Sequence, residues 1–119
     1  MNIDKFQRTN AMRGARWHQG DLTQWSELEW AGAMCGEAGE AANVAKKIRR
    51  LDLSLPNREA GLTQDDSSAL REKLGDEVGD TIIYGLLLLS VLGFNASEVI
   101  GRVFDRKSVE YGFPERAEE

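Results

Sequence analysis

The stretch Asp76-Glu77-Val78-Gly79-Asp80-Thr81-Ile82-Ile83-Tyr84-Gly85-Leu86-Leu87-Leu88-Leu89-Ser90-Val91-Leu92 decides the fold of this chain. Glu77 and Asp80 are spaced i, i+3, so a helix projects both carboxylates from one face. At about 100° per residue the same face continues through apolar or aromatic positions, which are Tyr84, Leu87, Leu88 and Val91. The segment therefore predicts a buried helix whose inward face carries two acids.

A second acid pair, Glu37 with Glu40, has the same spacing in an earlier helical pattern. The two acids share their azimuth with Trp30, Ala33, Val44, Ile48 and Leu51. Four carboxylates converging in a core repel one another and lose hydration unless cations or protons compensate. Mg²⁺ or Mn²⁺, which take oxygen ligands, would supply that compensation. Glu37, Glu40, Glu77 and Asp80 are therefore the predicted metal ligands and catalytic residues.

Glycines accompany both acid pairs. Gly36 and Gly39 bracket Glu37, whereas Gly75 and Gly79 bracket Glu77. A glycine inside a helix costs about 1 kcal/mol relative to alanine. We expect close approach of the two helices to repay this cost, because it would bring the acid pairs together.

The whole chain has the pattern of an all-α protein, and no segment alternates like a strand. Four helices are expected, over residues 4–16, from the Ser26 and Glu29 capping box to about Leu51, from Asp65, Asp66 or Ser67 to Gly93, and from the cap Asn95 to about Tyr111. The segments 17–25 and 52–63 are expected loops. With 119 residues the chain predicts one domain, spanning 1–119.

Composition excludes several classes of function. The formal net charge of -5 disfavours a nucleic-acid partner, since binding a polyanion needs a basic face. The longest apolar run, 82–92, is shorter than a membrane span, and the polar N-terminal residues have no signal-peptide core. A single cysteine, Cys35, fits a reducing compartment, and we expect it to be buried. The expected location is the cytoplasm, with no membrane partner.

The four consecutive leucines of 86–89 surround the third helix. A short chain offers few apolar faces to cover them. A homodimer or homotetramer with this helix in the interface is therefore expected.

These motifs resemble those of the MazG-like nucleoside triphosphate pyrophosphohydrolases, a branch of the all-α NTP pyrophosphatases. The family pattern E-x-x-E followed by E-x-x-D is met by Glu37 with Glu40 and by Glu77 with Asp80. The surrounding matches are Asn10, Arg13, Trp17 and His18, then Glu29-Trp30, GEAGEAAN (36–43) and KKIRR (46–50), and finally Lys107-Ser108 with Tyr111-Gly112-Phe113. The resemblance implies an oligomeric four-helix MazG-like bundle.

The resemblance also implies Mg²⁺-dependent, or Mn²⁺-dependent, hydrolysis of (deoxy)nucleoside triphosphates between the α- and β-phosphates. The products would be a nucleoside monophosphate and pyrophosphate. One acid would orient the attacking water or accept its proton, and we favour Glu40. Lys107 and Tyr111 match the phosphate side of the family's C-terminal helix.

Three further residues are candidate substrate contacts. Lys47, beside Glu40 on the helical wheel, would meet a phosphate or simply neutralise the acids. Tyr84 would hydrogen-bond a ligand or lie in the core. Of the three tryptophans, Trp30 is the one on the azimuth of the acids, where it would stack on a base or fill the core.

Two other functions compete with this interpretation. A di-metal oxidoreductase expects Glu-x-x-His motifs, and no histidine follows either acid pair. A non-catalytic helical module that binds metal or another protein would use the same acids without turnover, and measurement of pyrophosphate release separates it from the enzyme.

Overall fold

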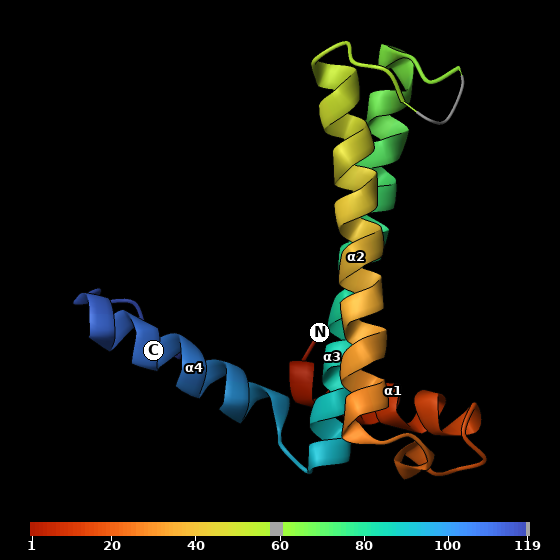
Figure 1. Ribbon diagram of the computed structural model, residues 1–119. Helices are drawn as coiled ribbons and strands as arrows, with labels where there is room; N and C mark the ends of the chain where they lie inside the picture. Colours follow the sequence, from red (N-terminus) through yellow and green to blue (C-terminus); the bar gives the residue numbers. More distant parts are fainter. Residues whose placement is uncertain (58–60, 119) are drawn as a thin grey trace. The chain divides into compact units, whose positions relative to one another are not determined.

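Four α-helices form the structure, a computed structural model that describes residues 1–57 and 61–118. They are α1 (Ile3–Arg16), α2 (Glu27–Asp52), α3 (Ser67–Leu92) and α4 (Ala96–Tyr111) (Figure 1). Two short 3₁₀ helices, η1 (Leu22–Gln24) and η2 (Gln64–Asp66), precede α2 and α3. The described residues contain no strand, which confirms the all-α prediction.

Helix boundaries follow side-chain and glycine caps. Asn2 accepts hydrogen bonds from the backbone N–H groups of Asp4 and Lys5, both at 3.0 Å, and thereby begins α1. The predicted cap Asn95 accepts from Glu98 N at 3.2 Å. Gly93 and Gly112 follow α3 and α4 with φ of 79° and 72°, a conformation that glycine adopts without steric cost. The predicted helix ends are thus confirmed.

The segment 17–25, expected to be a loop, contains η1 because Asp21 organises a tight turn. Its Oδ1 accepts hydrogen bonds from Thr23 N at 2.9 Å and from Thr23 Oγ1 at 2.6 Å. Part of the second expected loop, residues 58–60, lies outside the described residues.

The chain divides into two compact units, and each is described by itself. The first comprises residues 1–27 and 86–119 and therefore contains α1, η1, the C-terminal end of α3 and α4. The second, residues 28–85, contains nearly all of α2 and the larger part of α3.

In the first unit, α1 is fixed to the turn between α3 and α4 by polar side chains. The buried Gln7 donates from Nε2 to Phe94 O at 2.9 Å and accepts from Ala96 N at 2.8 Å. Asp4 accepts from Ser97 N at 2.9 Å and from Ser97 Oγ at 2.6 Å. The buried Leu87 packs against Gly14 so closely that an added Cβ there would lie 2.8 Å from Leu87 Cδ2.

In the second unit, α2 and α3 run side by side in opposite directions (Figure 1). At the end nearest the connecting loop their core consists of Val44, Ile48, Leu51 and Leu70, with Leu62 and Leu74 packed against it. At the other end, Trp30 contacts Tyr84 with ring centroids 6.2 Å apart. The acid pairs lie between these two apolar contacts in sequence.

Within the described residues, no single helix is both long and apolar enough to cross a membrane, and only the bent pair α3–α4 meets these two criteria jointly.

Candidate functional site: a carboxylate cluster between α2 and α3

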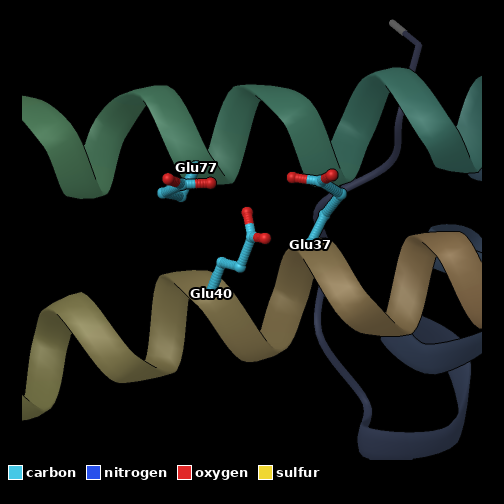
Figure 2. A group of neighbouring side chains, drawn as sticks. All are labelled: Glu37, Glu40 and Glu77. Atoms are coloured by element: carbon cyan, nitrogen blue, oxygen red, sulfur yellow. The ribbon is translucent and has the colours of Figure 1, made fainter.

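Three carboxylates converge between the two helices of the second unit. Figure 2 shows Glu37 and Glu40 projecting from α2 toward Glu77 of α3, with the Glu40 carboxylate between the other two. One oxygen from each residue lies within 4.8 Å of the others. The i, i+3 spacing therefore places the α2 acids on the face that meets α3, as the sequence predicts.

Asp80, the fourth predicted ligand, is outside this group of three but acts on it electrostatically. Its charge is among the causes that raise the pKa values of Glu37 and Glu77. Asp80 follows Glu77 by three residues on α3. The structure therefore brings all four predicted acids into one electrostatic neighbourhood.

The acids are not enclosed in a core, which corrects the expectation from the sequence. Glu37 and Glu77 are half-buried, whereas Glu40 and Asp80 are exposed. The helical wheel places the acids in line with core residues, but it does not show how far neighbouring residues cover them. The exposed Glu40 and Asp80 are accessible to a small ligand.

Partial burial and mutual repulsion both disturb the ionisation of the cluster. Desolvation is the largest cause that raises the pKa of Glu37, followed by the charges of Glu40, Asp80 and Glu77. Desolvation also leads for Glu77, whose pKa is raised further by hydrogen bonding with Glu40 and by the charges of Glu40 and Asp80. The cluster thus favours binding a proton or another cation.

Lys73 also contributes to the electrostatics of the acid cluster, although it was not predicted from the sequence. Its charge lowers the pKa of Glu77 and so partly offsets the repulsion. The signal was available, because Lys73 precedes Glu77 by four residues on α3, a spacing at which helical side chains interact. Lys47, predicted either to meet a phosphate or to neutralise the acids, is half-buried on α2. It is not among the causes that shift the pKa of Glu37 or Glu77.

The glycines beside the acids do not serve close helix packing, so that expectation is wrong. A Cβ added at Gly36, Gly39, Gly75 or Gly79 would meet no atom within 4 Å. Close approach occurs instead at Gly85, where an added Cβ would lie 3.3 Å from Met34 Sδ. The four glycines leave open space on the helices that carry the acids.

Trp30 and Tyr84 form an aromatic contact that belongs to the core more than to a ligand site. Trp30 is 1% exposed, and its ring packs against the half-buried Tyr84. With so little exposed surface, the Trp30 ring leaves no face on which a base could stack. Among the tryptophans, Trp17 is 72% exposed and has Arg13 over its ring at 5.6 Å.

Lys107 and Tyr111 lie together on α4 in the first unit. Lys107 Nζ is 3.3 Å from Glu110 Oε2 and 5.9 Å from the centroid of the Tyr111 ring. Both side chains are exposed. Their predicted contact with phosphate stays a prediction.

Cys35, expected to be buried, is exposed on α2. The helical pattern around it contains small residues, Ala33, Gly36 and Ala38, which cover little of their surroundings. The thiol is therefore accessible to solvent in this chain.

The donor set suits a hard divalent cation. Mg²⁺ takes oxygen ligands at about 2.1 Å in an octahedron, so two ligand oxygens lie roughly 3 to 4 Å apart. Separations within 4.8 Å approach this spacing, and small side-chain rotations would close the difference. Glu37, Glu40 and Glu77 are the residues that could hold the ion.

Comparisons of the chain with protein-family models, with curated proteins and with solved structures gave no match. The resemblance to the MazG-like enzymes therefore rests on the quoted motifs.

Proposed function

We propose that this chain is a metal-dependent hydrolase that cleaves (deoxy)nucleoside triphosphates between the α- and β-phosphates, releasing a monophosphate and pyrophosphate. The observation that carries the proposal is the convergence of the Glu37, Glu40 and Glu77 carboxylates between α2 and α3, where Glu40 is exposed. The bond that is cut, and the assignment to an oligomeric MazG-like bundle, come from the sequence motifs.

The chemistry of the cluster supports a phosphate substrate. Bound Mg²⁺ or Mn²⁺ would neutralise charge on the phosphates and increase the acidity of a water molecule. Mg²⁺ sites commonly pair one or two carboxylates with substrate phosphates, which accounts for acids that stay partly exposed. Exposure leaves room for the substrate to complete the coordination.

Each acid has a proposed role. Glu37 and Glu77 would hold the cation, since their raised pKa values reflect crowding that a cation relieves. Asp80 would add to the negative field. Glu40, placed between the other two carboxylates in Figure 2, would also orient the attacking water or accept its proton.

The decisive experiment measures product formation from a panel of common nucleoside triphosphates with Mg²⁺, with Mn²⁺ and with a chelator. Chromatography is expected to show monophosphate and pyrophosphate in equal amounts, and only when metal is present. Release of orthophosphate and diphosphate would overturn the assignment of the cleaved bond. Metal binding without turnover of any nucleotide would favour the non-catalytic module.

Variants tie the activity to the cluster. Glu40→Gln and Glu77→Gln are each expected to lower turnover by about a hundredfold or more, because they remove a ligand charge or the proton acceptor. Glu72→Gln is the matched control, since Glu72 is an exposed acid on the same helix as Glu77. Near-normal rates in both cluster variants would refute the proposed site.

A further inference from the structure

The exposed residues of α1 form one basic face. They recur three and four residues apart, at positions 5, 8, 9, 12, 13 and 16, which is the spacing of a single side of a helix. No acid is among these six residues, and four of them are bases, namely Lys5, Arg8, Arg13 and Arg16. Since a helix rises 1.5 Å per residue, the four bases extend over about 16 Å. We call these four residues the basic face of α1.

The opposite side of α1 packs within the first unit and does little to neutralise this face. Gln7, Asn10 and Gly14 are buried there. The one acid of the helix, Asp4, is half-buried and accepts two hydrogen bonds from Ser97 of α4. Hydrogen bonding to Ser97 is the largest cause that lowers the pKa of Asp4, whereas the charge of Arg8 contributes least. The carboxylate of Asp4 is therefore engaged mainly with α4.

The positive charge of the chain is concentrated in this segment. Residues 1–20 contain four bases and one acid, whereas the rest of the chain contains 11 bases and 19 acids. The net charge of -5, which disfavours a polyanion as a partner, thus conceals a segment of net charge +3. Charges farther apart than the Debye length, about 8 Å at physiological ionic strength, are largely screened. A partner on α1 would therefore respond to the local bases more than to the net charge.

Trp17 adds an aromatic ring at the C-terminal end of the basic face. Its backbone stays in the helical region, and its side chain is 72% exposed. The guanidinium of Arg13 lies 5.6 Å from the ring centroid, a cation–π contact. Bases that neutralise phosphates, together with an exposed ring on which a base can stack, are how proteins bind single-stranded nucleic acid. The bases of a duplex are already stacked on one another and are not available to such a ring.

A lipid surface fits this helix less well. Helices that lie on anionic membranes bury an apolar face at the boundary of the acyl chains. In α1 the side opposite the bases is already buried in the protein, and it carries Gln7, Asn10 and Gly14. Along α1, every residue of which the structure describes, Met12 is the one large apolar side chain exposed between Lys5 and Arg16.

We propose that the basic face of α1, with Trp17 at its end, binds single-stranded nucleic acid. The bases contact phosphates, and the ring of Trp17 stacks on a nucleobase. At 3.4 Å per nucleotide in a stacked strand, 16 Å corresponds to about five phosphates. These contacts use neither the 2′-hydroxyl nor the edges of the bases, so DNA and RNA bind alike and without sequence preference. The proposal does not depend on hydrolysis by the acid cluster.

The test measures the fluorescence anisotropy of labelled oligothymidine and oligouridine in a chelating buffer, so that no metal ion joins the strand to the acid cluster. Both oligonucleotides are expected to bind. Each neutralised phosphate of a single strand contributes about -0.7 to the slope of log K against log salt, so four contacts give a slope of about -2.8. Absence of binding would overturn the proposal, as would binding only to vesicles of phosphatidylserine and phosphatidylcholine.

Two double variants tie binding to the basic face. Arg8→Gln/Arg16→Gln is expected to raise the dissociation constant by about tenfold or more and to make the salt slope shallower by about 1.4. Arg102→Gln/Arg106→Gln is the matched control, since both arginines are exposed on α4 and the net charge changes equally. The control is expected to bind like the wild type. Equal loss of affinity in both double variants would overturn the assignment to α1.

A third variant separates stacking from charge. Trp17→Ala is expected to raise the dissociation constant by about fivefold or more and to leave the salt slope unchanged, because it removes a stacking surface without removing a charge. Trp17→Phe, which keeps an aromatic ring, is expected to retain most of the affinity. Wild-type affinity in Trp17→Ala would overturn the stacking contact and leave a partner that recognises charge alone, such as an acidic peptide.

Discussion

At the scale of single residues, crowded carboxylates couple the ionisation of the cluster to the stability of the fold. Desolvation and the neighbouring acids raise the pKa values of Glu37 and Glu77 above the ordinary 4.5. The folded chain therefore binds protons more tightly than the unfolded chain in the window above pH 4.5. In that window these two groups make the free energy of unfolding fall as the pH rises, until both raised pKa values have been passed.

Thermal unfolding in a chelating buffer tests this coupling. Between pH 4.5 and neutral pH, the wild type is expected to lose thermal stability relative to the double variant Glu37→Gln/Glu77→Gln, which carries no charge at either position. Mg²⁺ at neutral pH is expected to restore the wild type and to leave the double variant unchanged. Parallel pH profiles of the two proteins would contradict the proposed repulsion.

The acids of the site could be predicted from the sequence because i, i+3 spacing fixes the face on which helical side chains lie. Their partial exposure could not, since a helical wheel gives direction but not the distance to neighbouring elements. Gln7 was missed for a related reason. Its three partners, Ser90, Phe94 and Ala96, lie far along the chain, so no local pattern reveals the contact.

At the scale of helices, a glycine of α1 is required for close packing, whereas a glycine of α2 is not. Gly39→Ala is expected to stabilise the chain by about 0.5 to 1 kcal/mol, because alanine is the better helix former and its Cβ meets no atom within 4 Å. Gly14→Ala is expected to destabilise the chain by about 1 to 3 kcal/mol, because its Cβ would lie 2.8 Å from Leu87 Cδ2.

Denaturant unfolding of both variants measures these opposite shifts. A loss of stability in Gly39→Ala would show that another surface packs on α2 at that position.

The contrast between these glycines also explains why the sequence assigned the wrong purpose to Gly36 and Gly39. Composition shows that a glycine is present in a helix, but only the packing of the neighbouring helix shows whether its missing side chain is needed. By comparison, the caps Asn95 and Gly93 are local signals, and both were predicted correctly.

At the scale of the whole molecule, residues of the same chain already cover much of the apolar surface of α3. The prediction of an oligomer started from residues 86–89, but Leu86 and Leu87 are buried and Leu88 and Leu89 are half-buried. A charge placed at Leu86 would therefore unfold the chain before it reported on association. Exposed apolar side chains are found on α4, where Ile100, Val103 and Phe104 are 47%, 39% and 47% exposed.

If association and folding are linked, the unfolding temperature depends on protein concentration. For a chain that forms the homodimer expected from the sequence, dilution shifts the equilibrium toward the monomer and lowers the unfolding temperature. Differential scanning calorimetry over a wide concentration range measures the effect. An unfolding temperature that stays constant on dilution of the wild type would mean that the monomer carries the full stability of the fold.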